Sequence, residues 1–588
     1  MFGTRIKTML LAITTVATIG VAAQTTPRDT IGFDCAINAD AFSSLFYAND
    51  FIPSLKFNAG NKKYNFFGGF TFYHTEEDKT RHETFIDTDK ANRQERRGEI
   101  DKTTRRTDYF AGVVLNPTRL QSLALQFDGY GVFPTTATGR FEKCLEVAYA
   151  PGQEVEADGK AMQISRDHSD FTNAVAAYSI AFDSIGGRTL SARIDYNRFT
   201  GLQGDEILTD FNVPEWIACQ GYKDLDHSKS RNYSAAAAFN APAIGIIHGL
   251  DICCNYFFSE RTSTYKLNEE VISSRQFERL YRASLGGNIP IGKFSVDARL
   301  AGEYIHRTDN IEGDITEPSF RFLPYIKASF NAGKFSAFLS AERTVIRPSL
   351  ANTDGIVRRN DEMMIVASNS RLHSTVNDLF TAQAFYNHHS LSTSWLIDYS
   401  PIVTTYTAVD ASTISSTKIN FRRTTALTFT YAYNNDIKPW WSLDANIGVS
   451  WVRNPGSELQ KILWQRFCHI DNKFNLKKWG AIDIVFNYQW HTVAGNVVTA
   501  SNLSLDIDWT KSLLNDRLQL TVGVRDLLDT EGDLEKFYAD NLYYILDDKP
   551  VSRRLHLGIA FKFSTPHKTT PRHLPDVTPI ANFDITRL

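Results

Sequence analysis

Two segments near the end of the chain, residues 517–526 and 554–563, alternate strictly between apolar and polar side chains. A period of two over about ten residues predicts a β-strand with one apolar and one polar face. The same alternation recurs at residues 294–300, 443–451, 482–490 and 503–509. In a soluble sandwich the apolar faces would pack together, whereas in a membrane barrel they face lipid and the polar faces line a lumen.

Short turns alternate with long connections between the predicted strands. Ten segments rich in Asn, Gly, Asp and Pro have the composition of tight hairpin turns, and they lie at residues 61–63, 116–118, 183–187, 241–244, 288–292, 331–333, 387–390, 434–439, 477–478 and 512–516. Ten longer, more polar connections lie at about residues 75–105, 131–169, 200–230, 259–276, 307–319, 346–374, 409–417, 453–465, 491–498 and 528–552. With one connection in the first hairpin, this pattern predicts about 22 strands, with short periplasmic turns and long extracellular loops.

The composition favours the membrane barrel over the soluble sandwich. Aromatic residues make up 12% of the 588 residues, yet the mean hydropathy is negative. A barrel combines these properties because only every second strand residue meets lipid and aromatic girdles mark both interfaces. The net charge of −3 gives no indication of a nucleic-acid partner. The sequence therefore predicts an all-β fold, a transmembrane antiparallel β-barrel in contact with outer-membrane lipids.

The N-terminus has the pattern of an export signal. Arg5 and Lys7 precede an apolar run at residues 9–21, which ends in small residues before Gln24. This run is shorter than the roughly 20 residues that a spanning helix needs. We therefore expect residues 1–23 to be a signal peptide, and the mature protein to reside in the outer membrane.

The strand pattern also divides the mature chain. Residues 24–31 are predicted to be a short N-terminal segment, and residues 32–563 the barrel. Residues 564–588 contain four prolines, which lack the N–H that a strand ladder needs, so this part is predicted to be a Pro-rich periplasmic tail. The last strand then ends at the aromatic residue Phe563, through which we expect the barrel-assembly machinery to recognise the protein.

Several short motifs resemble one family of barrels. Residues 342–350, with the sequence ERTVIRPSL, resemble the Arg-x-Ile-x-Arg-Pro-Ser strand end of TonB-dependent receptor barrels, in particular those of the outer membrane protein beta-barrel family. Residues 369–374 keep the Asn and Leu of that family's Asn-Pro-x-Leu-x-Pro-Glu loop but lack its prolines and its acid. Residues 524–529 resemble the end of the penultimate strand, and residues 63–69 the second hairpin. Together these motifs cover about residues 32–563.

The resemblance implies a role in transport across the outer membrane, or a receptor role derived from it. Such receptors carry a plug domain before the first strand, and residues 24–31 are too few to form one, so energised uptake does not follow from the resemblance. We expect inward-folded connections, such as residues 131–169 and 346–374, or a separate plug protein to fill the lumen, and a separate plug or energiser protein is the expected partner. The alternative is a structural or interaction barrel that presents its loops to a partner and conducts nothing.

Polar strand residues are candidates for the lining of the lumen. They are Asp297, Arg299, Glu303, Asp444, Asp483, Asp506, Asp508, Arg525 and His556. The alternative interpretation is that they are polar only because the lumen is wet, with opposite charges pairing between neighbouring strands. By the same alternation, Val522 and Phe561 are expected to face lipid, and Gln519 the lumen.

The sequence gives no pattern of catalytic chemistry. It contains neither a nucleophile elbow nor a zinc-binding spacing, so we expect no enzyme activity, cofactor or metal site. The six cysteines are too sparse for a disulfide framework.

Overall fold

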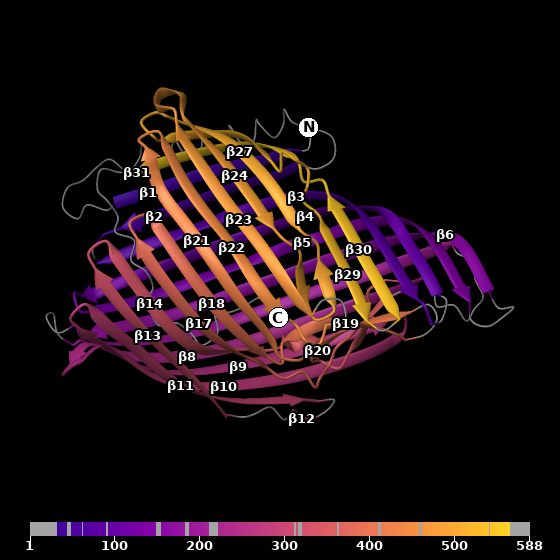
Figure 1. Ribbon diagram of the computed structural model, residues 1–588, viewed down its shortest axis with the longest axis horizontal. Coiled ribbons are helices and arrows are strands. Elements are labelled where there is room, and N and C mark those ends of the chain that lie inside the picture. The colour runs from indigo at the N-terminus through magenta and orange to yellow at the C-terminus, as the bar shows by residue number, and fades with distance from the viewer. Residues whose placement is uncertain are drawn as a thin grey trace.

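The structure is a computed structural model of the chain. It describes residues 32–43, 49–61, 63–89, 92–148, 154–182, 187–210, 221–310, 313–315, 320–361, 364–409, 413–457, 461–539 and 541–564. The predicted signal peptide, the segment at residues 24–31 and the tail beyond residue 564 lie outside the described residues. Within them the chain forms a closed antiparallel β-barrel of 22 strands (Figure 1), which confirms the predicted fold class and strand number.

The barrel strands follow one another around the wall in chain order, each antiparallel to the next. The barrel closes where β1 pairs with β31, from Asp34 opposite Ser564 to Ser43 opposite Leu555. The 22 strands are β1 (Gly32–Ser43), β2 (Asn49–Gly60), β3 (Tyr64–Asp87), β4 (Asn92–Thr118), β5 (Gln121–Ala148), β6 (Glu154–Ala181), β7 (Thr189–Asp210), β8 (Tyr222–Ile244), β9 (Ile247–Leu267), β10 (Glu270–Ile291), β11 (Phe294–Asp309), β13 (Phe320–Ala332), β14 (Phe335–Ile346), β17 (Thr375–Tyr386), β18 (His389–Tyr399), β21 (Thr424–Lys438), β22 (Trp441–Arg453), β23 (Ile462–Asn475), β24 (Ala481–Gln489), β27 (Asn502–Leu513), β28 (Leu518–Arg525) and β31 (Arg554–Ser564).

Nine of the ten predicted tight turns lie where consecutive barrel strands join, and most of the tenth, at residues 183–187, lies outside the described residues. Several lie one to three residues further along the chain than the sequence indicates, because the turn needs a residue that tolerates a left-handed backbone. Gly245 and Gly333 provide this conformation with φ of 62° and 63°, and Asn387 does so with φ of 54°. These turns form the short rim of the barrel.

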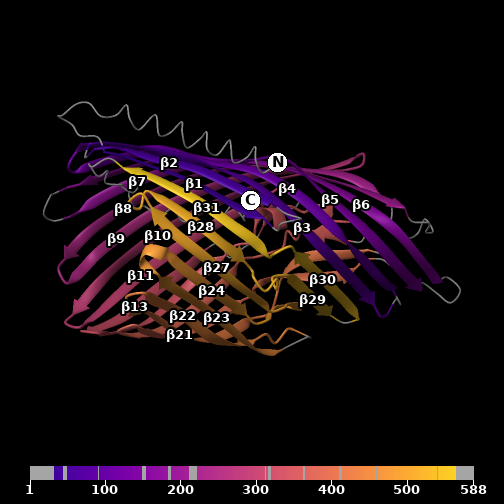
Figure 2. The ribbon, with the colours of Figure 1, turned by 90° about the horizontal axis from the view of Figure 1, so that it is seen from above.

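The prediction of long loops in the first half of the barrel is wrong, because most of these residues continue the barrel strands. β3 to β10 have between 21 and 28 residues each. The predicted loop at residues 131–169, for example, is paired as β5 and β6 as far as Ala148 opposite Glu154. A spanning strand needs only about 9–11 residues, so β3–β10 form a tall wall, and Figure 2 shows β4, β5 and β6 of this wall reaching beyond the other strands. The outer parts of these strands could not be recognised from an alternation of apolar and polar residues, because a paired strand in water has no side that faces lipid.

A band of exposed apolar side chains surrounds the barrel. Leu285 of β10 and the directly opposite Leu300 of β11 are 52% and 50% exposed. Toward the extracellular side, the rings of Tyr256, Tyr281 and Tyr304 stand next to one another on adjacent strands, with centroid separations of 5.1 and 6.3 Å. An exposed apolar band with an aromatic edge is the surface that contacts lipid and its interface.

The C-terminal strands show the same two faces. Val522 of β28 is 42% exposed and lies opposite Leu557 of β31, which is 39% exposed. The next residue toward the N-terminus of β31, His556, is only 7% exposed. Adjacent residues of one strand therefore have contrasting surroundings, as the period of two requires.

Two connections between wall strands form a separate four-stranded sheet. β15 (Val357–Arg359) and β16 (Met364–Ala367) follow β14, whereas β19 (Ile402–Ala408) and β20 (Ile414–Asn420) follow β18. The strand order is β15-β16-β20-β19, and β16 runs parallel to β20. We call these four strands the inner sheet. Figure 1 shows β19 and β20 toward the end of the barrel from which the tall wall extends.

Further short strands extend the sheet of the tall wall past β3. β25 (Thr492–Ala494), β26 (Val497–Thr499), β29 (Asp533–Ala539) and β30 (Leu542–Pro550) pair in this order, and β30 then pairs with the outer part of β3. β12 (Gly313–Ile315) pairs with β11, and η1 (Leu350–Asn352) and η2 (Lys477–Trp479) are single 3-10 turns. Within the described part of the chain no helix is long and apolar enough to cross a membrane.

An apolar core joins the inner sheet to β3, β29 and β30. Phe85, Met364, Ile414 and Phe537 are 0%, 7%, 0% and 1% exposed and form one cluster. The ring of Tyr406 on β19 lies 4.9 Å from that of Phe537 on β29. We call the inner sheet together with β29 and β30 the cap. The predicted inward folding of residues 346–374 thus yields β15 and β16 of the cap, whereas residues 131–169 stay in the wall.

Candidate functional site

Four of the nine predicted lumen residues form one polar cluster at the seam of the barrel. Arg525 contacts Asp506 (Nη1 to Oδ2, 3.0 Å) and Asp508 (Nη2 to Oδ2, 2.8 Å). The imidazole of His556 bridges Asp508 and Asp40, with nitrogen to oxygen distances of 2.9 and 3.4 Å. The cluster crosses β27, β28, β31 and β1, and it therefore links the two ends of the barrel sheet.

Two further predicted residues belong to a row of carboxylates. Asp444 of β22 lies opposite Asp471 of β23, and Asp483 of β24 lies opposite Asp508 of β27. Lys473 of β23 lies opposite Asp483 and is the nearest cation in register. Neighbouring like charges on one face are unfavourable unless water or cations compensate them, so this row gives that side of the barrel an acidic surface.

Asp297 and Arg299 make ordinary cross-strand pairings. Asp297 of β11 lies opposite Lys327 of β13. Arg299 Nη2 lies 3.2 Å from Asp251 Oδ2 of β9. Each charge has an opposite charge on a nearby strand, which is the pattern expected for a polar lumen face whatever passes through it.

Glu303 has a different environment, because it holds one end of a cap connection. Its side chain is 2% exposed and forms an ion pair with Arg347, the first residue after β14. Arg282 of β10 and Arg321 of β13 lie directly opposite Glu303 on its two sides. In the sequence Arg347 stood out only as part of the Arg-Pro-Ser motif. The structure gives it a physical role, which is to hold the start of the connection against the wall.

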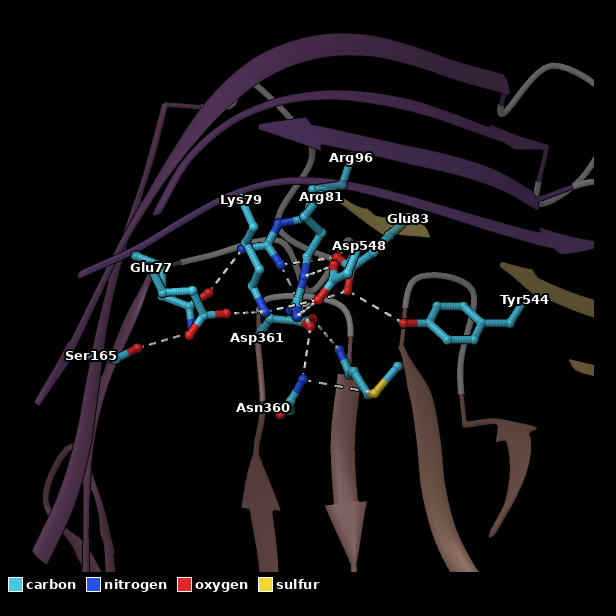
Figure 3. A network of polar contacts seen from close by, with 12 residues as sticks. Glu77, Lys79, Arg81, Glu83, Arg96, Ser165, Asn360, Asp361, Tyr544 and Asp548 are labelled. Atoms are coloured by element: carbon cyan, nitrogen blue, oxygen red, sulfur yellow. Dashed lines mark hydrogen bonds and ion pairs between the residues drawn. The ribbon is translucent and has the colours of Figure 1, made fainter. Parts of the chain in front are cut away.

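Sequence reasoning missed a buried polar network between the tall wall and the cap (Figure 3). Arg96 of β4 is 0% exposed and donates from Nη1 to Glu83 Oε2 (3.0 Å) and from Nη2 to Gln163 Oε1 (3.1 Å). Its Nη1 also lies 3.8 Å from Asp361 Oδ2, next to the inner sheet. Tyr544 of β30 donates to Glu83 Oε1 (3.3 Å). The network therefore connects β3, β4, β6, β30 and the β15–β16 connection.

A second part of this network is centred on Asp548 of β30. Arg81 donates to both carboxylate oxygens at 2.7 Å each, and Lys79 donates at 2.9 Å. Burial acts to raise the pKa of Asp548, but the hydrogen bonds and charges of Arg81 and Lys79 outweigh it and lower the pKa. The sequence predicts residues 75–105 to be one of the long polar connections. Instead most of these residues belong to β3 and β4, and several of their side chains, among them Glu83, Phe85 and Arg96, are buried.

Polar contacts also join the inner sheet to the opposite part of the tall wall. Arg358 of β15 donates to Asp354 (Nη1 to Oδ1, 3.0 Å; Nη2 to Oδ2, 2.6 Å) and to Asp226 of β8 (Nε to Oδ2, 2.6 Å). Gln276 of β10 donates to Thr353 Oγ1 at 3.0 Å. These contacts fasten the β14–β17 connection to β8 and β10.

Asp224, on the extracellular part of β8, lies beside this attachment. Tyr265 donates to Asp224 Oδ2 (2.9 Å) and accepts a hydrogen bond from the backbone N–H of Arg359 (2.8 Å). Burial raises the pKa of Asp224 to about 6, although hydrogen bonds from Tyr265 and the Asp205 backbone oppose the rise. This carboxyl group therefore changes charge close to neutral pH.

The described residues hold no group of three or more His, Cys, Asp and Glu that could bind a metal ion. The cap and wall side chains form ion pairs and hydrogen bonds that connect elements far apart in sequence. Such an arrangement can hold a movable element closed, and a charged ligand or water can replace its partners.

A closed barrel of 22 strands with an exposed apolar band is an integral outer-membrane protein. Residues 181–561 match the outer membrane protein beta-barrel family, which is more than half of the 588 residues. The protein belongs to this family, and the resemblance predicted from the sequence is confirmed. A comparison with curated proteins gives no match.

Solved structures with the same fold include several receptors. The siderophore receptor PirA from Pseudomonas aeruginosa is 10% identical, with a TM-score of 0.51 over 92% of this chain and 81% of that one. The copper transporter OprC is 10% identical, with a TM-score of 0.62 over 92% and 84%. The ferric enterobactin receptor PfeA from Pseudomonas aeruginosa, in complex with enterobactin, is 11% identical, with a TM-score of 0.59 over 92% and 82%. At these identities the likeness is one of fold.

Proposed function

We propose that the protein is a receptor that transports a ligand across the outer membrane, and that its cap is the gate. The observation that supports this is the inner sheet, which two of the chain's own connections form and which polar contacts fasten to the tall wall and to β11. A barrel of about 22 strands normally has a plugged lumen. Solved barrels of the same fold carry the names of a siderophore receptor and a copper transporter, which agrees with a transport role.

The two sides of the inner sheet differ in physical character. Toward β3, β29 and β30 it shares the apolar core around Phe85 and the network of Arg96. Toward β8 and β11 it is held by the ion pairs Arg358–Asp226 and Arg347–Glu303. Exposing apolar surface costs about 25 cal/mol per Å², whereas an ion pair can exchange its partner for water. We therefore expect the inner sheet to open away from β8–β11 while it stays attached to β3 and β30.

Conductance in a planar lipid bilayer tests the proposal. The wild-type protein should show little conductance, and a variant with residues 353–368 replaced by a short Gly-Ser linker should show a stable, large conductance. The shift in electrophoretic mobility on heating, which folded barrels show, establishes that the variant is folded. A folded variant that conducts no better than the wild type would contradict a gating role for the cap.

The alternative function is a structural or interaction barrel, and the tall wall is the observation that favours it. Strands of up to 28 residues present a large extracellular surface to a partner without any need for an open lumen. The same bilayer experiment separates the two functions, because a barrel of this second kind conducts nothing even without β15 and β16. In both proposals the protein is not an enzyme and needs no cofactor.

The partners follow from the surfaces of the barrel. Outer-membrane lipids would contact the apolar band, and the barrel-assembly machinery would recognise β31, in which Phe563 lies opposite Cys35 of β1. A separate plug or energiser protein would act from the periplasmic side. The polar strand residues, including the row of Asp444 and Asp483, would line the route of the ligand below the cap.

A further inference from the structure

A cavity of about 480 Å³ lies between the tall wall and the inner sheet. Strands β5 to β9 line it on the wall side, and the inner-sheet strands β15, β16, β19 and β20 line it on the other. Its volume is in the range of small-molecule sites, which is about 300–1,000 Å³. It lies on the polar side of the inner sheet, where Arg358 contacts Asp226.

On the wall side, the cavity is lined by a row of small residues on adjacent strands, which we call its floor. The row consists of Ser169 of β6, Gly201 of β7 and Ser228 of β8, which lie in direct register. On one side of this row stand Tyr130 and Phe199, and the Tyr130 ring is stacked 5.6 Å from that of Phe171, which lies opposite Phe199. Small residues leave room for a ligand, and the aromatic rings offer flat apolar faces beside it.

Arg261 of β9 is a buried cation that lines this cavity. Its side chain is 5% exposed, and its Nε donates to Ser263 Oγ at 3.2 Å. Its Nη1 has no hydrogen-bond partner, and among the described residues no carboxylate oxygen lies within ion-pair distance of it. The charges of Asp354 and Asp226 act on this guanidinium from beyond ion-pair distance, but its buried Nη1 lacks a hydrogen bond, which leaves a position open for an anionic group.

The inner sheet supplies the facing groups. Lys418 of β20 lines the cavity, and it has no ion pair among the described residues. The hydroxyl-bearing residues around the cavity are Ser169, Ser228, Ser368, Thr404, Ser416 and Thr417. Asp226 Oδ1 is buried without a partner and can accept a further hydrogen bond. The lining therefore combines the cations Arg261, Arg358 and Lys418, the carboxylates of Asp167 and Asp226, many hydroxyl groups and aromatic rings.

We infer that this cavity binds a small hydroxylated carboxylate of the sugar-acid class. Arg261 and Lys418 hold its carboxylate, Asp226 and the surrounding hydroxyl groups bind its hydroxyls, and the Tyr130–Phe199 end contacts its apolar ring face. Paired charges and bidentate arginine contacts are the strong elements of carboxylate recognition. Because Arg261 belongs to the wall and Lys418 to the inner sheet, the bound carboxylate bridges the two. The inference rests on the proposed receptor function, for which it names the class of ligand.

Isothermal titration of the purified full chain in detergent, with glucuronate as the probe, tests the site. We expect glucuronate to bind and glucose not to bind, because glucose lacks the carboxylate. Arg261→Met should lower the affinity for glucuronate at least tenfold. It should not impair folding, because it replaces an unpaired buried charge by an apolar side chain of similar length. Arg275→Met is the matched control, since Arg275 is exposed, pairs with Glu260 and lies away from the cavity lining.

Further variants and probes distinguish the outcomes. Ser228→Phe keeps Arg261 but fills the floor of the cavity, so it should also abolish binding of glucuronate. Unchanged binding in both Arg261→Met and Ser228→Phe would overturn the site. Binding of inorganic phosphate but not of glucuronate would overturn the ligand class, and binding of neither would overturn the inference. The bilayer conductance of the 353–368 replacement is measured without ligand, so the gating proposal can fail or hold independently.

Discussion

Replacing Arg358 by Met tests whether ion pairs hold the inner sheet against the wall. The Arg358 side chain is 17% exposed and joins Asp354 on its own connection to Asp226 of β8. Met keeps most of the apolar length of the side chain but makes neither ion pair. Without Arg358, the fully buried Asp354 keeps, among the described residues, only the hydrogen bond from the Ile356 backbone N–H at 3.1 Å, and Asp226 loses its ion pair.

The free-energy cost of Arg358→Met depends on how deeply the carboxylates that remain are buried. Removal of one partner from a buried ion pair costs about 3–5 kcal/mol. Arg275→Met removes a pair of similar geometry, with Arg275 Nη2 at 2.6 Å from Glu260 Oε1, but the Arg275 side chain is 57% exposed. An exposed pair contributes about 0–1 kcal/mol. The two variants therefore differ in expected cost mainly through burial.

Hydrogen exchange of the backbone amides in β16 and β20 measures this cost directly, because it reports the free energy of local opening. At 1.4 kcal/mol per factor of ten, Arg358→Met should accelerate exchange about 100- to 4,000-fold, and Arg275→Met about fivefold at most. An Arg358→Met/Asp226→Asn double variant should recover part of the protection, because it removes one of the uncompensated carboxylates. Equal exchange in the Arg358→Met and Arg275→Met variants would refute the reasoning.

Two further predictions concern the wall and the pH dependence of the cap. Val522→Arg places a charge in the apolar band and should lower the stability of the barrel by about 2–4 kcal/mol, whereas Gln519→Arg should have a small effect. Cysteines introduced at positions 522 and 519 test this orientation. Labelling at 522 but not at 519 by a water-soluble reagent would contradict it. The pKa of Asp224 is raised by burial to about 6, above the value of about 3.9 for an unfolded Asp, so the closed cap binds this proton more tightly than the open form. Its contribution to the closed state is then fully present below about pH 4 and is lost as the pH rises through about 6. The protection factor of the inner-sheet amides, which compares their exchange rate with the intrinsic rate at the same pH, should therefore fall from pH 5 to pH 7, and Asp224→Asn should remove this fall.

The barrel itself could be predicted because its signals are local. A period of two marks each lipid-facing strand, and turn residues such as Asn387 and Gly333 mark the short rim. The outer parts of β3–β10 could not be predicted in the same way, since both faces of these strands lie outside the lipid. Neighbouring residues of these strands still face opposite sides: Arg96 is buried toward the cap, whereas the side chain of the next residue, Arg97, is 68% exposed.

The cap could not be predicted because its contacts join distant parts of the chain. Its strands are short, with three to seven residues each in the inner sheet, and a segment of that length gives no periodic signal. Glu83, Arg96 and Asp361 meet in one buried network, yet each of them reads as an ordinary surface charge in the sequence. The same holds for Arg261, whose burial depends on the inner sheet that covers it.

The points at which the connections leave the wall explain why some of them enter the barrel and others do not. Pro348 comes two residues after the end of β14, and Pro401 two residues after the end of β18; both connections lead into the inner sheet. Proline lacks the N–H that the next rung of the ladder needs. Proline alone is not sufficient, however, since Pro134 lies within β5 at a bulge, where the pairing with β6 shifts and then continues. At Pro348 the preceding residue, Arg347, is bound to the buried Glu303 of the wall. We conclude that the break in the ladder ends the strand, and that the ion pair holds the start of this connection against the wall.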